Sequence, residues 1–292
     1  MRKRLLGTIG VRMRLLGVVL LFLAGWNLTA TAAEAEIEQD MDEEAAAAMS
    51  AAREKNRAHF HIGLEFTNFS YEETDDGEEL MSIKGSMPGL VAGVYRYKPV
   101  FWNVGMAYHG GDLKYDGQYQ DGTPVETDTK DSIFELRGLL GGDLTEASYQ
   151  GRSILYTGLG YRLWSNEAEG TGGYRRKVSY VYMPFGAEFA FPISASSRIG
   201  LRGELDALLY GRVVSYLSDV HPSLPNVENR QTSGYGSRLS CFIEAGGEKS
   251  KVFVELFMRN WSVAESELDS TGSFIEPENT TRIYGLGLQI VF

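Results

Sequence analysis

The sequence predicts an all-β protein: an antiparallel, up-and-down transmembrane barrel of about ten strands, within a range of about eight to twelve. Three observations predict this fold. Segments in which apolar residues recur at every second position follow one another from His59 to Phe292. Short and long connections alternate between them, and the chain begins with a segment typical of exported proteins. Period-two alternation indicates strands, because successive side chains of a strand point to opposite faces.

The barrel is assigned to residues 58–292, where we find no long amphipathic helix and no sequence repeat. The alternation is clearest in the sixth expected strand, where Val181, Met183 and Phe185 share one face. The ten expected strands cover residues 59–72, 82–98, 101–116, 130–144, 152–165, 176–191, 198–216, 231–246, 251–264 and 279–292.

The connections between these strands predict how the barrel is oriented. Short ones lie near residues 98–100, 145–151, 192–197 and 247–250. Longer, polar ones, rich in Gly or Asp, lie near residues 73–81, 117–129, 166–175, 217–230 and 265–278. In outer-membrane barrels the short turns face the periplasm and the long loops face outside. We therefore expect an even number of strands, short periplasmic turns and longer extracellular loops.

Residues 1–33 are expected to be a cleavable signal peptide. They hold five basic residues and no acidic ones, an apolar run from Leu15 to Trp26, and small residues at positions 30–33. The apolar run is shorter than the ~20 residues that a membrane-spanning helix needs. The true start is either Met1 or Met13, because a normal signal also begins at Met13.

Residues 34–57 form a separate acidic, Ala-rich segment without Gly or Pro. A short periplasmic helix and a disordered arm both fit this composition. A third possibility is a peptide that enters the barrel as a plug.

The C-terminal strand shows the same alternation and resembles the assembly signal of outer-membrane barrels. Small or polar residues alternate with apolar ones up to the aromatic Phe292. The apolar positions are Tyr284, Leu286, Leu288, Ile290 and Phe292. The resemblance implies recognition by the barrel assembly machinery and a location in the bacterial outer membrane, in contact with its lipid and with lipopolysaccharide.

Composition restricts the partners. The chain has 28 basic and 39 acidic residues, and removing five basic ones with the signal changes the net charge from −11 to −16. This charge argues against binding nucleic acid, which requires clustered positive charge. Cys241 is the one cysteine of the sequence, so no internal disulfide can form. Aromatic side chains gather at membrane interfaces. We assign this anchoring role to Tyr97, Trp102, Tyr161, Trp164, Phe191 and Phe292.

The strand phase predicts a network of paired charges in the lumen. Acidic and basic residues are nearly balanced on the face that points inward, and charges persist inside a protein when they are paired. The expected network is Glu65, Glu135, Arg137, Arg162, Glu188, Arg202, Glu204, Asp206, Arg212, Arg238, Glu244, Glu255 and Arg259. Long paired side chains would fill most of a barrel this small, so we expect a plugged lumen.

Ten strands with polar outer loops resemble the omptin family of outer-membrane proteases. Members of that family carry an Asp-x-His pair on one loop, facing two acidic residues across the rim. Asp219-Val220-His221 occupies a similar place, and a carboxylate near an imidazole suits general-base chemistry. The opposing acid pair is not clearly matched, and Asp112 and Asp116 are the candidates considered for it.

No cofactor or metal site is expected. His59 and His61 share one strand face, but the sequence suggests no third ligand for a metal. Motifs of lipases, phosphate-binding loops and zinc proteases are also missing from the sequence. The first interpretation is therefore a non-enzymatic integral barrel whose loops serve surface interaction or envelope integrity, with an unknown extracellular ligand. An omptin-like protease and a narrow selective channel are the alternatives.

Overall fold

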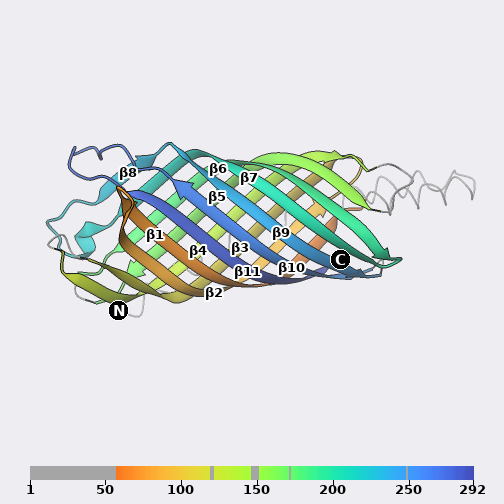
Figure 1. The fold of residues 1–292 in the computed structure, drawn as a ribbon, viewed down its shortest axis with the longest axis horizontal. Coiled ribbons are helices and arrows are strands. Elements are labelled where there is room, and N and C mark those ends of the chain that lie inside the picture. The colour runs from red at the N-terminus through yellow and green to blue at the C-terminus, as the bar shows by residue number, and fades with distance from the viewer. Residues whose placement is uncertain (1–56, 119–121, 146–150, 171, 248) are drawn as a thin grey trace, which may run out of the picture. The chain divides into compact units, whose positions relative to one another are not determined.

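Figure 1 shows the fold of the chain in a computed structural model. The structure describes residues 57–292 except 119–121, 146–150, 171 and 248. The expected signal peptide and all but one residue of the acidic segment 34–57 therefore lie outside the described residues. Where the structure describes the chain, no helix is long and apolar enough to cross a membrane.

The described part of the chain is built almost entirely from strands. They are β1 (His59–Asp75), β2 (Glu78–Arg96), β3 (Phe101–Gln118), β4 (Pro124–Asp143), β5 (Arg152–Ala168), β6 (Arg175–Ser194), β7 (Ser197–Ser215), β8 (Val227–Gln231), β9 (Gly234–Gly246), β10 (Lys251–Val263) and β11 (Glu278–Val291). A single turn of 3₁₀ helix, η2 (Leu217–Asp219), precedes β8.

These strands close into an antiparallel barrel. Strands that are neighbours in sequence pair with each other, except β8 and β9, and β1 pairs with β11 from His61 to Thr74. Strand β7 pairs with β8 over Gly211–Ser215 and with β9 over Ser197–Ala207, so β8 and β9 share one place in the wall. The eleven strands thus occupy ten positions, which confirms the expected strand number and its evenness.

The connection between β1 and β2 is much shorter than we expected. The strands remain paired up to Asp75 and Glu78, which leaves a two-residue turn at Asp76 and Gly77. Both turn residues have positive φ, 48° and 84°, as the twist of a tight hairpin requires. The expected loop at 73–81 is therefore wrong: Asp-Gly is a hairpin signal, and the polar strand ends on either side remain paired.

The outer wall carries an apolar belt. It lies around the half of the barrel nearer the short turns, whereas polar side chains face outward toward the other end. Ile62, Leu64 and Phe66 of β1 are 46%, 46% and 56% exposed, and the expected C-terminal set, Tyr284 to Phe292, is 43–53% exposed. This confirms the predicted phase of both strands, with these apolar side chains outside, Glu65 of β1 inside, and small or uncharged residues on the inner face of β11.

A bulge in β7 reverses the phase of its second half. Tyr182 pairs with Leu208 and Val181 with Tyr210, so Leu209 is an extra residue in the strand. An extra residue exchanges the two faces of the strand beyond it. Arg212 consequently lies on the outer wall, where its Nη2 is 2.6 Å from Oε2 of Glu228. The prediction that Arg212 belongs to the lumen is wrong, because it continued the alternation through the bulge.

Candidate functional site: the interior of the barrel

The half of the interior nearer the long connections holds a cluster of apolar side chains. Phe69, Ile83 and Tyr182 have no exposed surface, and Trp164 is 2% exposed. The rings are in contact: the centroids of Tyr71 and Trp164 are 4.6 Å apart, and those of Tyr182 and Trp261 are 5.1 Å apart. Trp164, which we had assigned to the membrane interface, is therefore part of the interior core. Sequence reasoning missed this cluster.

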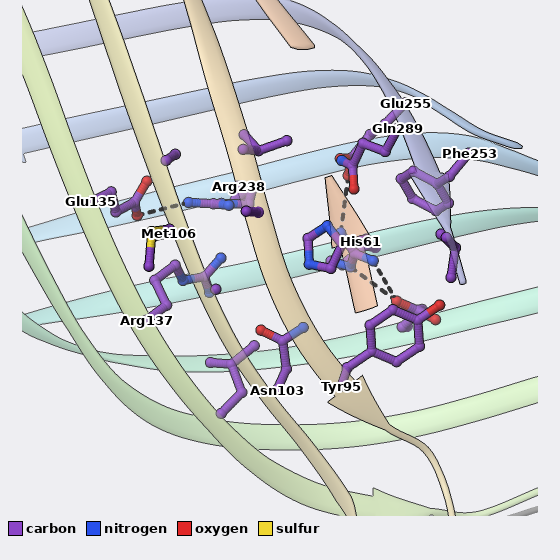
Figure 2. A pocket seen from close by; sticks show the side chains of 18 of the residues that line it. His61, Tyr95, Asn103, Met106, Glu135, Arg137, Arg238, Phe253, Glu255 and Gln289 are labelled. Atoms are coloured by element: carbon purple, nitrogen blue, oxygen red, sulfur yellow. Dashed lines mark hydrogen bonds and ion pairs between the residues drawn. The ribbon is translucent and has the colours of Figure 1, made fainter. Parts of the chain in front are cut away.

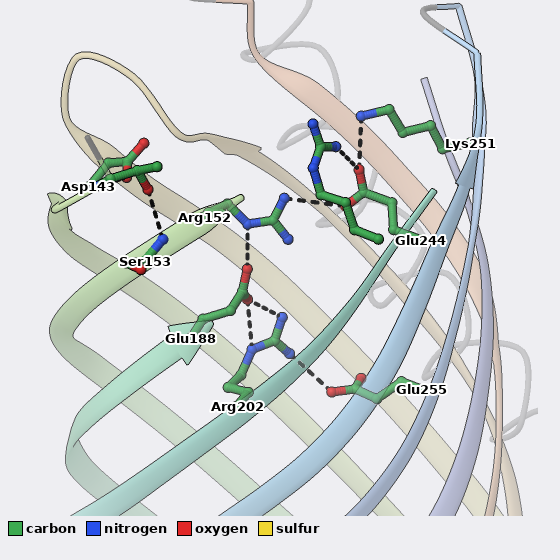
Figure 3. Close-up of polar contacts among 10 residues, drawn as sticks. Asp143, Arg152, Ser153, Glu188, Arg202, Glu244, Lys251 and Glu255 are labelled. Carbon is green, nitrogen blue, oxygen red and sulfur yellow. Dashed lines mark hydrogen bonds and ion pairs between the residues drawn. The ribbon is translucent and has the colours of Figure 1, made fainter. Parts of the chain in front are cut away.

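Ion pairs join the strands at the other end of the interior, near the short turns. Figure 3 shows Arg152 between two carboxylates, with Nε 2.6 Å from Glu188 and Nη1 3.3 Å from Glu244. Arg202 Nη2 is 2.6 Å from the same Glu188. Glu244 also receives Lys251, 2.9 Å away. Each carboxylate thus faces at least two cations, which offsets the cost of removing it from water.

A second group of ion pairs lies at mid-height. Glu135 receives Arg238 at 3.0 Å and Arg259 at 3.4 Å, and the Tyr182 hydroxyl also donates to it. Arg259 also forms an ion pair with Glu65, whose Oε1 is 3.3 Å from Nη2 of Arg259. Nε2 of His109 is 2.8 Å from Oε2 of Glu65. The hydrogen bond from Tyr182 to Glu135 connects this charged layer with the apolar cluster nearer the long connections.

The structure places every residue of the expected network inside the barrel except Arg212. Arg137 pairs with Glu204 at 2.5 Å. Arg162 and Asp206 are 5% and 4% exposed, and each has a polar atom without a hydrogen-bond partner among the described residues. That the network serves to stabilise the barrel stays a prediction.

Some interior charges escaped the sequence reasoning. Arg152 and Lys251 are the first residues of β5 and β10, next to turns where alternation has barely begun. Arg176 could have been found, because it continues the inward phase of β6 established by Tyr180 and Tyr182. Tyr97, which we had assigned to a membrane interface from the sequence, instead has its ring stacked against the guanidinium of Arg152, with Cζ of Arg152 4.0 Å from the ring centroid.

A cavity of about 150 Å³ lies between the charged side chains and strands β2 and β3 (Figure 2). Two small inward residues of β3, Gly105 and Ala107, leave this space, which Arg137 and Arg238 also line. The Asn103 amide lines the same cavity. A buried water needs roughly 10–15 Å³ of such space, so the cavity can hold several waters or one small solute.

The rim residues considered for proteolysis do not come together. Arg175 clamps the Asp219 carboxylate, with Nε and Nη2 both 2.8 Å away, and these hydrogen bonds lower the pKa of Asp219. Nδ1 of His221 is 2.7 Å from the Ser223 hydroxyl rather than near an acid. Asp112 and Asp116 project from the outer face of β3, away from the mouth of the barrel. The structure thus does not bring these four residues together in the omptin-like arrangement.

The two histidines near the start of β1 contact Tyr95. The ring centroids of His59 and His61 are 5.4 Å and 5.9 Å from that of Tyr95. Among the described residues, no cluster of three or more His, Cys, Asp or Glu side chains is arranged to hold a metal ion.

One comparison with a known protein supports the architecture. The outer-membrane protease OmpT from Escherichia coli superposes with a TM-score of 0.51 at 13% sequence identity, covering 80% of this chain and 96% of that chain. The likeness is one of fold. The translocator domain of the autotransporter NalP from Neisseria meningitidis has a TM-score of 0.45 at 12% identity, with 89% and 96% covered. OprG from Pseudomonas aeruginosa has a TM-score of 0.36 at 10% identity, with 81% and 97% covered.

No family model matches the sequence, and no curated protein matches it. The superposition with OmpT shows that the chain adopts the fold of small outer-membrane barrels. At 13% identity it does not extend to the activity of that protease.

Proposed function

We propose that the protein is an integral β-barrel of the bacterial outer membrane with a closed interior, which acts through its loops in surface interaction or envelope integrity. It is exported with residues 1–33 as its signal. The short turns face the periplasm and the long loops face outside. The apolar belt contacts membrane lipid and lipopolysaccharide, and the C-terminal strand is the part presented to the barrel assembly machinery.

The observation that carries the proposal is the filling of the bore by two successive layers. In the first, Arg238 of β9 reaches across the interior to Glu135 of β4, and Glu188 binds Arg152 and Arg202 of the two neighbouring strands. In the second, Tyr182 and Trp261 belong to an apolar cluster with almost no exposed surface. An ion would have to cross both layers. Removing water from it in the apolar layer would cost several kcal/mol or more, about the cost of an unpaired buried charge.

The belt supports the membrane location. Apolar side chains such as Leu205, Leu159 and Leu140 are 65%, 59% and 60% exposed on the outer wall. A contiguous apolar surface of this extent is unfavourable in water and is typical of a wall that faces lipid.

Conductance across planar bilayers tests the closed interior. Purified protein should insert, as verified by co-flotation with liposomes, and should give no stable single-channel steps. Large and regular steps from the wild type would contradict the closed interior and favour the narrow-channel alternative. Failure to float with liposomes would instead contradict the membrane location.

A further inference from the structure

The connection between β10 and β11, residues 264–277, is held at the mouth of the barrel by the Glu276 carboxylate and by the Asn229 amide of β8, which donates to the Phe274 carbonyl at 3.0 Å. Glu276 is 6% exposed and forms an ion pair with Arg176 of β6. The backbone N–H of Glu276 donates to the Ser266 hydroxyl, 2.9 Å away, so both ends of the connection are held together. Outside this anchor the connection is largely exposed, including Leu268 and Ile275.

Arg176 is already engaged by the barrel wall. It also forms an ion pair with Glu73 of β1, and its Nη2 donates to the Tyr71 hydroxyl at 2.6 Å. Arg176 is 5% exposed and Glu73 is 8% exposed. Two carboxylates therefore share one guanidinium in a site with little access to water. A single positive charge does not balance both when both are ionised.

The other titratable groups that face Glu276 do not supply the missing charge. They are the hydroxyls of Tyr71, Tyr174 and Tyr180. A tyrosine is neutral at physiological pH, so these groups can donate hydrogen bonds but carry no positive charge.

Burial raises the pKa of Glu276 to about 7, against the effect of Arg176, and Glu73 adds to the rise. The docked state of the connection therefore binds a proton more tightly than the free state, in which Glu276 has an ordinary pKa near 4.5.

We propose that residues 264–277 form a proton-dependent latch at the mouth of the barrel, docked when Glu276 is protonated and loosened when it is ionised. Protonated Glu276 still accepts from Arg176 while Glu73 keeps the ion pair. Ionised Glu276 competes with Glu73 for the same guanidinium. Docking and release of the latch thus change the surface at the end of the barrel that carries the long connections.

The sign and size of the effect follow from linkage. The stabilisation of the docked latch by proton binding is complete below the ordinary pKa of a glutamate. It is lost as the pH rises through the raised pKa of Glu276. The docking equilibrium should weaken by roughly 10- to 100-fold between about pH 5 and about pH 8, because one proton changes it by at most about tenfold per pH unit.

A nitroxide label at the tip of the latch tests the proposal. Cys241→Ser removes the native thiol, and Ser270→Cys adds one at an exposed position of the latch. In detergent micelles, the label should be restrained at about pH 5 and mobile at about pH 8, with a midpoint near the raised pKa of Glu276. A spectrum that does not change over this range would overturn the proposal.

Matched variants identify the group responsible. Glu276→Gln mimics the protonated side chain, so its label should stay restrained at both pH values. Glu73→Gln removes the competing carboxylate and should move the midpoint to lower pH. Glu267→Gln alters an exposed carboxylate of the same connection and should keep the wild-type response. A full pH response in Glu276→Gln would exclude Glu276 as the switch.

The latch and the closed interior can fail separately. The apolar cluster lies beneath the latch and is formed by strand residues such as Phe69 and Ile133. Release of the latch should therefore leave the bilayer conductance at background. Each variant is verified as folded by its different gel migration before and after boiling.

Discussion

Arg202 and Glu255 are joined over the inner face of β9, which separates their strands β7 and β10 in the wall. Arg202 Nη1 is 3.0 Å from Oε1 of Glu255, while Nη2 of the same guanidinium is 2.6 Å from Glu188 on β6. One side chain thus connects three strands (Figure 3). Bonds of this kind restrain the cross-section of the barrel in a way that backbone pairing between neighbours does not.

Arg202→Ala is expected to destabilise the barrel by ~3–5 kcal/mol, because it leaves buried carboxylates without their guanidinium. Urea unfolding in detergent, followed by gel migration of unboiled samples, measures the change. Arg212→Ala is the matched control, since it removes an arginine whose side chain is 44% exposed beside Glu228. Such a surface pair contributes about 0–1 kcal/mol. Equal losses of unfolding free energy in the two variants would contradict the buried network.

Cys241 should report whether the outer wall faces lipid. It is exposed on β9 and lies on the same face as Leu239 and Ile243, which are 55% and 47% exposed. In vesicles, a membrane-impermeant maleimide should leave Cys241 unmodified, whereas a lipid-soluble maleimide should label it. As a control, a thiol introduced at Ser270 in a Cys241→Ser background should react with both reagents. Rapid labelling of Cys241 by the impermeant reagent would place this wall in water.

Removal of Phe292 should impair assembly more than expression. Its backbone N–H donates to the Phe60 carbonyl at 2.8 Å, and the two rings stack 6.4 Å apart where β11 meets β1. We expect less heat-modifiable protein in the outer membrane at an equal total amount of protein. Phe191→Ala, which removes another exposed aromatic ring of the belt, is the control. Equal assembly of both variants would argue against an assembly signal in the C-terminal strand.

His221→Ala is expected to change neither stability nor peptide hydrolysis. The imidazole lies in the exposed segment after η2, and its Nδ1 bonds Ser223 rather than a catalytic acid. We expect only background cleavage of basic peptides by the wild type, with or without lipopolysaccharide. Turnover that disappears in His221→Ala but survives in Ser223→Ala would contradict this prediction and move the protein into the hydrolase class.

The sequence predicted what depends on local geometry. In β1, the phase of Ile62, Leu64 and Phe66 follows from period-two alternation alone, as does the inward direction of Glu65. Where local geometry changes, the same reasoning is wrong. The bulge at Leu209 turned Arg212 to the outside, and the Asp76-Gly77 turn replaced an expected loop.

The sequence by itself determined the barrel, its even set of strand positions and most of the charged residues that face the interior, because each strand records its two environments in its own alternation. Only the tertiary structure decided which interior residues meet. Arg202 reaches Glu255, and Arg176 brings Glu73 and Glu276 together, across strands far apart in the chain. Those contacts depend on the tilt and stagger of the closed barrel, which no single strand encodes.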